Sequence, residues 1–217
     1  MIPVLFKDRV DAGRRLAEKL RGCVESDGIV LAIPRGGVVV GAEVARRLGL
    51  AFDLIVPRKI GSPQNPEVAI GAVTQDGSVI LNKRLIDLLG ITQIELKELV
   101  SHEIREIKRR IALYRGGEAT GDYTGRQVLV VDDGVATGYT MFASLRSARN
   151  MHPKELILAI PVAPPDTLEA LKKEVDHTVC LISPDDFYAV GQFYEKFEQT
   201  SDEAVIKIIK ELKKSKK

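Results

Sequence analysis

Residues 128–141 read VLVVDDGVATGYTM. Four apolar residues run into two adjacent aspartates, Asp132 and Asp133, and the residues that follow are mostly small. A short apolar run bounded by turn residues predicts a buried strand, and a helical pattern begins after the small residues. The neighbouring carboxylates repel each other, and the apolar run before them offers no counter-charge. They therefore mark either an ordinary strand end or a site for a partner that is cationic or rich in hydroxyl groups.

The rest of the chain alternates short apolar runs with helical patterns, which predicts an α/β fold with a doubly wound, mainly parallel, Rossmann-like sheet. Helices capped by Asp8 and Asp166 are expected, together with a final helix from about Asp202. The predicted strands are residues 28–33, 53–60, 68–74, 127–132, 155–163 and 178–183, and an Asp76-Gly77 turn joins the third strand to a short pairing segment.

Residues 83–115 interrupt this alternation with two predicted helices. Thr92 and Glu95 form a capping box for the second helix. Its apolar residues recur at spacings of four and three: Leu96, Val100, Ile104, Ile107, Ile111 and Tyr114. The stripe predicts a helix that covers its own domain; contact with a second copy through residues 92–115 is the alternative.

The composition excludes several classes of protein. With 217 residues, 45% hydrophobic residues and a net charge of +2, we expect one globular domain and no global attraction to nucleic acid. No run approaches the ~20 apolar residues that span a bilayer. Cys23 and Cys180 lack metal-ligand spacing, which favours reduced thiols and a cytoplasmic protein.

The chemistry of the opening stretch follows from its place in such a sheet. Ligands bind at the carboxyl ends of parallel strands, where Asp132 and Asp133 are expected. The amides of residues 137–140 and the hydroxyls of Thr137 and Thr140 could hold a phosphate at a helix start. Two carboxylates beside it could accept hydrogen bonds from a diol, so the pattern indicates a ribose 5-phosphate. A plain strand–turn–helix does not require two acids followed by Thr-Gly-x-Thr.

VLVVDDGVATGYT resembles the phosphoribosyl pyrophosphate (PRPP) signature of the type I phosphoribosyltransferases. Gly134 departs from that signature, where an aliphatic residue is usual, so we expect a looser loop that keeps its ligands. IPRGG (33–37) matches the family's pyrophosphate loop, which often contains a non-proline cis peptide, here Pro34–Arg35. The resemblance assigns PRPP binding to Gly36, Gly37, Asp132, Asp133, Ala136, Thr137, Gly138, Tyr139 and Thr140.

RKIGSPQNPE (58–67) matches the family's mobile catalytic loop. The resemblance implies catalytic roles for Arg35, Arg58, Lys59 and Glu67, with the three cations directed at pyrophosphate; ordinary surface charge is the alternative for the last three residues. Residues 1–200 as a whole resemble uncharacterised bacterial and archaeal members, which have no settled acceptor.

The resemblance implies Mg²⁺-dependent transfer of a phosphoribosyl group from PRPP to a nitrogenous acceptor, with Mg²⁺ near Asp132 and Asp133 but contacting them indirectly. Ala136 stands where 6-oxopurine transferases carry an aspartate, which disfavours hypoxanthine and guanine. A PRPP sensor without turnover is the alternative, and a hydrolase on the same fold is a third reading.

The family often covers the acceptor with a hood built from a terminal segment. The predicted domain therefore spans residues 1–217, with a core at about 1–183, inserted helices at about 83–115 and a hood at about 184–217. Aromatic residues cluster in that segment and could stack on a base: Phe187, Tyr188, Phe193 and Tyr194. Packing of a small lobe onto the sheet explains the same cluster.

Overall fold

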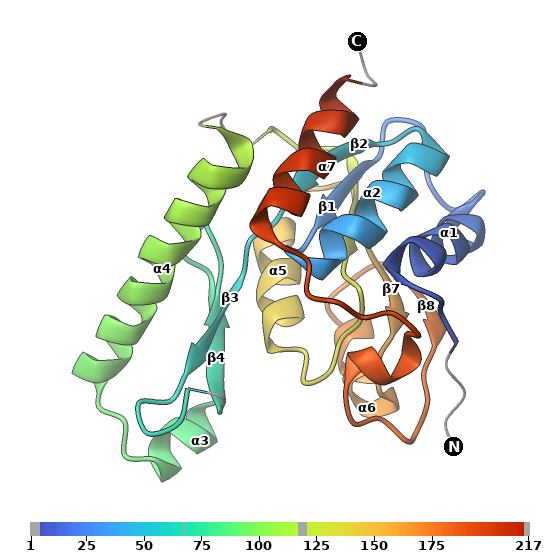
Figure 1. The fold of residues 1–217 in the computed structure, drawn as a ribbon. Coiled ribbons are helices and arrows are strands. Elements are labelled where there is room, and N and C mark those ends of the chain that lie inside the picture. Colours follow the sequence, from blue (N-terminus) through green and yellow to red (C-terminus); the bar gives the residue numbers. More distant parts are fainter. Residues whose placement is uncertain (1–4, 67, 117–120, 215–217) are drawn as a thin grey trace.

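The central sheet of the computed structural model has five parallel strands in the order β2-β1-β6-β7-β8 (Figure 1). The structure describes residues 5–66, 68–116 and 121–214. The strands are β1 (Ile29–Ala32), β2 (Ala51–Leu54), β6 (Gln127–Val131), β7 (Glu155–Val162) and β8 (His177–Ile182). The quoted VLVV run forms most of β6, in which every residue is buried. The predicted parallel α/β fold is confirmed.

Helices cover both faces of this sheet, because successive side chains of a strand point to opposite faces. In β1, Val30 and Ala32 pack into a core with α1 (Arg9–Leu20), α2 (Gly36–Leu48) and α7 (Asp202–Lys214). Ile29 and Leu31 pack into a second core on the other face. That core is covered by α5 (Tyr139–Arg149) and α6 (Pro165–Lys172). The sheet is therefore doubly wound.

A second, antiparallel sheet stands beside the first, in the order β3-β4-β5 (Figure 1). Its strands are β3 (Arg58–Gly61), β4 (Ala69–Val73) and β5 (Val79–Leu81). The prediction of one strand over 53–60 is wrong, because β2 and β3 lie in different sheets. Pro57 stands between them and has no N–H to donate to a ladder. The β4–β5 hairpin is confirmed, with Gly77 at its turn (φ 83°).

The inserted segment forms α3 (Lys83–Leu88) and α4 (Gln93–Arg115), and the Thr92–Glu95 capping box is present. The apolar stripe of α4 faces inward: Leu96, Ile107 and Tyr114 are buried, and the helix contacts β3, β4 and α7. The stripe therefore packs against its own domain, as the first reading predicts. Oligomerisation through this helix stays a prediction.

Two further predictions concern helix starts. Asp8 caps α1, accepting a hydrogen bond from the Asp11 amide at 2.8 Å. Asp166 does not cap α6, which starts after Pro164; it lies in the first turn instead, because proline at the first helical position already suits the helix start. No helix in the described part of the chain is long and apolar enough to cross a membrane.

The tail after β8 returns to the N-terminal segment. Its short 3₁₀ helix, η1 (Val190–Phe193), is followed by a bridge between Tyr194 and Phe6, and the Phe193 carbonyl accepts hydrogen bonds from the amides of Leu5 and Phe6 at 3.1 and 2.9 Å. Phe6, Phe193 and Tyr194 are buried together. The tail therefore packs as a small lobe against the start of α1.

Candidate active site

The candidate site lies where the winding of the central sheet reverses. Strands β1 and β6 are neighbours, but the chain continues from β1 to one edge of the sheet and from β6 to the other. The Ile33 amide donates to the Val131 carbonyl at 2.9 Å, which extends the β1–β6 ladder to the carboxyl ends of both strands. Ligands of doubly wound sheets bind at such a switch point. Residues 34–37 and 132–140 both start from this point.

The turn after β1 packs directly against the two aspartates. Its Pro34–Arg35 peptide bond is cis, as the resemblance implied. A Cβ atom on Gly36 would lie 1.9 Å from Asp133 Oδ2, and one on Gly37 would lie 2.7 Å from Asp132 Oδ1. Only glycine leaves room for carboxylates so close to the backbone. The structure therefore places four residues predicted to bind the donor against one another, Gly36 beside Asp133 and Gly37 beside Asp132.

The aspartates have a cationic partner that the sequence did not reveal. Arg9, at the start of α1, places Nε 2.7 Å from Asp133 Oδ2. Burial and the charge of Asp133 raise the pKa of Asp132 well above its usual value, and Arg9 acts in the opposite direction. Arg9 precedes Asp133 by 124 residues, so no local pattern links them. The missing counter-charge is supplied by the fold.

The predicted phosphate loop runs into α5 as expected. Gly138 has φ 81°, a left-handed conformation that favours glycine, and α5 starts at Tyr139. The Tyr139 hydroxyl accepts a hydrogen bond from Asn82 Nδ2 at 2.7 Å, which ties the loop to the small sheet. Thr167 Oγ1 donates to the Ala136 carbonyl at 2.9 Å. The loop is thus held at both ends beside the amides that start the helix.

Gly134 does not loosen this loop, contrary to the expectation from the sequence. It is buried, with φ 154°, and a Cβ atom there would lie 2.5 Å from Val190 Cγ1 and 2.9 Å from Val162 Cγ1. Val190 of the tail packs so closely on the backbone after Asp133 that an aliphatic residue would not fit at position 134. The departure from the family pattern therefore follows from the position of η1.

The cationic side chains predicted to bind pyrophosphate come from both sheets: Arg35 follows a strand of the central sheet, and Arg58 and Lys59 lie on β3 of the small sheet. Arg35 Nη1 lies 3.7 Å from Asp202 Oδ1 of α7, and Arg58 Nε lies 2.6 Å from Glu103 Oε2 of α4.

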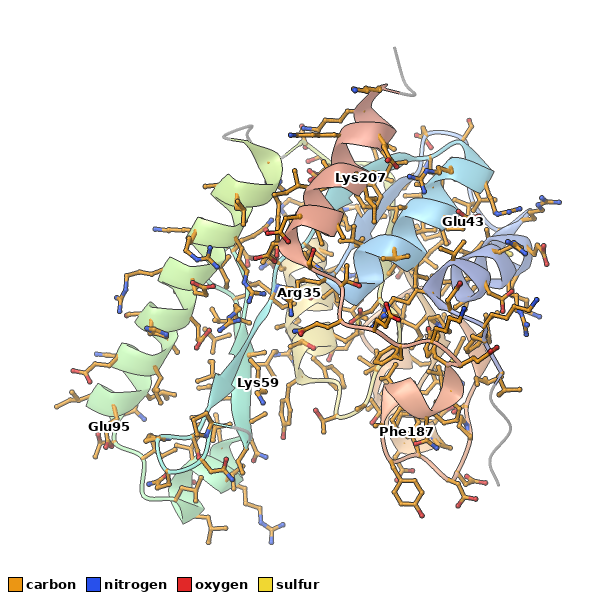
Figure 2. The ribbon with its side chains drawn as sticks, viewed as in Figure 1. Arg35, Glu43, Lys59, Glu95, Phe187 and Lys207 are labelled. Carbon is orange, nitrogen blue, oxygen red and sulfur yellow. The ribbon has the colours of Figure 1, made fainter. Side chains whose placement is uncertain are left out.

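Lys59 is exposed on β3, and Figure 2 shows Arg35 on the core and Lys59 on the small sheet. Glu67 lies outside the described residues. Arg35 and Arg58 are thus each paired with a carboxylate of a neighbouring helix. A pyrophosphate group would have to share or replace these partners.

The tail aromatics divide into core and surface. Phe193 is fully buried and Tyr194 is 4% exposed, so neither presents a ring for stacking on a base. Tyr194 instead donates its hydroxyl to the Asp133 carbonyl at 2.5 Å. Phe187 packs on Phe193, with 5.3 Å between ring centroids, whereas Tyr188 is 87% exposed. Lobe packing therefore explains Phe193 and Tyr194, and an acceptor role stays a prediction for Phe187 and Tyr188.

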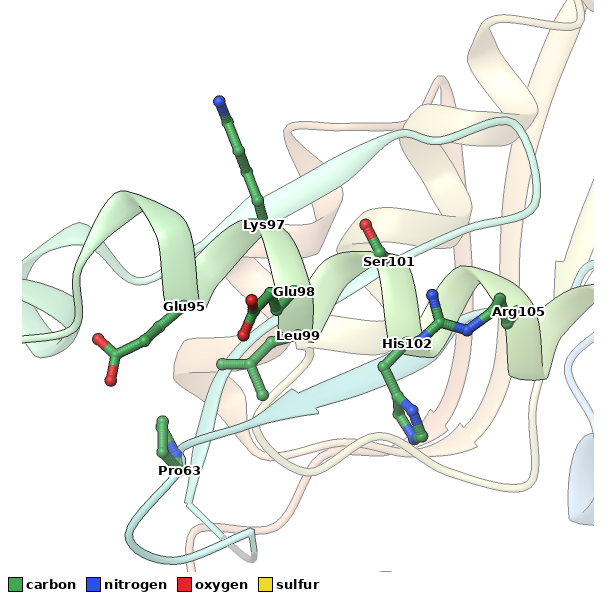
Figure 3. Close-up of a pocket in the computed structure, with 8 residues that line it drawn as sticks. All are labelled: Pro63, Glu95, Lys97, Glu98, Leu99, Ser101, His102 and Arg105. Carbon is green, nitrogen blue, oxygen red and sulfur yellow. The ribbon is translucent and has the colours of Figure 1, made fainter.

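Among the cavities that lie away from the aspartates, two adjoin α4 and β2. One, of about 590 Å³, opens on the outer face of α4 and includes Pro63, Glu98 and His102 in its lining (Figure 3). The other, of about 270 Å³, lies between β2 and the end of α7. Neither is lined by a residue predicted to bind the donor. We assign no ligand to them.

The residues at the switch point fit a magnesium ion that keeps most of its water. Within the described ranges, no group of three or more histidine, cysteine, aspartate or glutamate side chains could hold a metal ion. Asp132 and Asp133 supply carboxylate oxygens, the ligand type that Mg²⁺ prefers, and Mg²⁺ commonly takes only one or two carboxylates. Burial of Asp132 beside Asp133 would also favour a nearby cation.

Comparison with known proteins defines the class. The phosphoribosyl transferase domain model matches residues 6–198. Two Mycobacterium tuberculosis sequences, from strains CDC 1551 and H37Rv, are each 40% identical over 207 residues, which is 93% of this chain and 46% of theirs. Both carry the name "Putative phosphoribosyl transferase". The chain belongs to the phosphoribosyl transferase domain family, and it spans about half the length of these curated relatives.

Solved structures share the fold. TT1426 from Thermus thermophilus is 39% identical, with a TM-score of 0.80 over 96% of this chain and 99% of that one. A hypoxanthine phosphoribosyltransferase from Staphylococcus aureus matches 84% of this chain and 78% of its own, with 13% identity and a TM-score of 0.50. At that identity the likeness concerns the fold alone.

Proposed function

We propose that the protein transfers a 5-phosphoribosyl group from PRPP to a nitrogenous acceptor, releasing pyrophosphate, in the cytoplasm. One observation carries the proposal: the Asp132–Asp133 pair, the Arg35–Gly37 turn and the loop leading into α5 meet at the β1–β6 switch point. A ribose diol, a pyrophosphate and a 5-phosphate each have a matching group there. Family membership supports the same reaction class.

The proposed roles follow from charge. A cation bound beside the pair, together with Arg9, favours the ionised form of Asp132. Asp132 and Asp133 then accept hydrogen bonds from the ribose hydroxyls, while the amides at the start of α5 and the hydroxyls of Thr137 and Thr140 hold the 5-phosphate. Positive charge develops on the ribose ring and negative charge on the leaving pyrophosphate in the transition state. The carboxylates stabilise the positive charge on the ribose ring.

Arg35 and the amides of Gly36 and Gly37 stabilise the leaving group, with Arg58 and Lys59 contributing from β3. Arg58 must exchange Glu103 for the pyrophosphate oxygens to do so. Catalysis is then mainly a matter of orientation and electrostatic stabilisation.

We further propose dependence on Mg²⁺, which would be held near Asp132 and Asp133 through water and by the ligand itself. When bound, the ion supplies charge neutralisation for the pyrophosphate. Ala136, which has no carboxylate to offer a purine ring, supports an acceptor other than hypoxanthine or guanine.

The test is pyrophosphate release from PRPP and Mg²⁺ across a panel of nucleobases and amines. Acceptor-dependent release that disappears when Mg²⁺ is removed supports the proposal. Binding of PRPP with no release for any acceptor identifies a PRPP sensor instead. No binding of PRPP at all refutes the assignment of the site.

A further inference from the structure

We infer that Arg9 is a positioning residue for donor binding, which fixes the Asp133 carboxylate toward the ribose hydroxyls. The inference rests on the proposed function. Arg9 lies outside the PRPP signature and outside the pyrophosphate turn, yet its guanidinium contacts the acidic pair through the 2.7 Å pair with Asp133. The side chains of Arg9 and Asp133 are only 12% and 14% exposed, so solvent screens this pair less than a surface ion pair.

Arg9 is itself held on two further sides. Its Nη1 donates to the Glu198 carbonyl at 2.8 Å, and its guanidinium carbon lies 3.9 Å from the centroid of the Phe197 ring. A guanidinium stacked on a ring and bonded at two nitrogens has little freedom to rotate. Arg9 therefore presents Nε to Asp133 in one orientation.

Asp133 is correspondingly fixed from both ends. Arg9 holds its carboxylate, and the Tyr194 hydroxyl donates to its carbonyl at 2.5 Å. The backbone of Gly36 closes a third side, because a Cβ atom at that position would lie 1.9 Å from Asp133 Oδ2 and 2.8 Å from Arg9 Nε. The start of α1, the tail and the pyrophosphate turn thus converge on one carboxylate.

Because Arg9 contacts Asp133, its loss should affect ligands with a ribose group differently from ligands without one. The Asp133 carboxylate binds ribose hydroxyls. Inorganic pyrophosphate, which has no ribose, is bound by Arg35, by the amides of Gly36 and Gly37 and by the cations of β3. Loss of Arg9 should therefore weaken a ligand that carries ribose and leave pyrophosphate binding almost unchanged. General damage to the site would weaken both.

The experiment measures dissociation constants by isothermal titration calorimetry, for PRPP with Mg²⁺ and for inorganic pyrophosphate without Mg²⁺, because the ion would link pyrophosphate to Asp133. For Arg9→Gln we expect PRPP to bind about tenfold more weakly, the effect typical of losing a hydrogen bond between charged groups, and pyrophosphate to change less than about twofold. Arg9→Lys keeps the charge and should recover most of the PRPP affinity. Arg15→Gln is the matched control on the same helix: it removes a pair with Asp11 and should change neither constant.

Equal weakening of both ligands in Arg9→Gln, or no weakening of either, overturns the inference. If Arg9→Gln does not fold, Arg9→Lys decides: we expect about threefold weaker PRPP binding, because lysine lacks the planar fork, with pyrophosphate unchanged. An Arg9→Lys variant with wild-type affinity for PRPP would then overturn the inference. Failure of the wild-type protein to bind PRPP would instead overturn the proposed function.

Discussion

Substitution of Gly36 by alanine should weaken donor binding, whereas a glycine-to-alanine change in the core of the same helix should weaken stability alone. The added Cβ atom would lie 1.9 Å from Asp133 Oδ2. Because such contacts essentially never fall below 3.0 Å, the carboxylate must move by about 1 Å. That shift breaks its 2.7 Å pair with Arg9 and misdirects it toward the ribose. Hydrogen bonds to charged groups contribute about 1.5–3 kcal/mol, so we expect PRPP to bind about 10- to 100-fold more weakly.

The assay pairs calorimetric titration of PRPP with urea denaturation, and Gly41→Ala is the control. Gly41 lies on the same helix, but its added Cβ atom would meet Ala32 Cβ at 2.8 Å in the core, away from the aspartates. Both variants should lose about 1–2 kcal/mol of unfolding free energy through overpacking. Only Gly36→Ala should lose PRPP affinity. Wild-type affinity for PRPP in Gly36→Ala, or the same loss of affinity in both variants, would contradict this prediction.

Three further predictions concern stability and reactivity. Burial raises the pKa of Asp76, but hydrogen bonds from its own turn and from the end of α5 outweigh burial and lower that pKa to about 2. Its stabilising effect is therefore present above pH ~4 and lost as the pH falls toward 2. Since Asp76 is partly exposed, Asp76→Asn should cost about 1 kcal/mol at pH 7 in urea denaturation and nothing near pH 2; a constant difference would contradict this. Burial raises the pKa of Cys180 to about 11, so a thiol reagent at pH 8 should modify the exposed Cys23 rapidly and Cys180 only on unfolding; two fast thiols would contradict this. Gly134→Ala should cost about 2 kcal/mol by thermal denaturation, because its Cβ atom would collide with Val190, and an unchanged melting temperature would show that η1 does not pack there as described.

Local patterns predicted the elements well. The VLVV run gave β6, the Thr92–Glu95 pair gave the start of α4, and the apolar stripe of α4 proved to face its own domain. Each of these depends on residues within a few positions of one another. Periodicity and capping are interactions of that range.

Sheet membership was not predictable in the same way. Residues 53–60 look like one apolar strand, but β2 pairs with β1 whereas β3 pairs with β4. Pro57 was the only local signal of a break. The decision between one sheet and two depends on pairing partners far along the chain, which periodicity does not reveal.

The candidate site shows the same division. The acidic pair, the glycine turn and the helix start are contiguous motifs, and the structure brings them together. Arg9 and Tyr194 reach Asp133 from 124 residues before it and 61 residues after it, and no local pattern links either of them to Asp133. The parts of the site predicted to bind the ligand are thus local in sequence, whereas the residues that hold Asp133 in place are not.

The most direct test of the account is a calorimetric titration of PRPP with Mg²⁺ into the wild-type protein and into the double variant Asp132→Asn, Asp133→Asn. Asparagine keeps the size of each side chain but removes its negative charge and replaces one of its two acceptor oxygens with an NH₂ donor. We predict that the wild-type protein binds PRPP and that the double variant binds it at least about 100-fold more weakly, since two charged hydrogen-bond acceptors are lost, while remaining folded. Equal affinity of the two proteins would show that the ribose does not lie at this pair of aspartates.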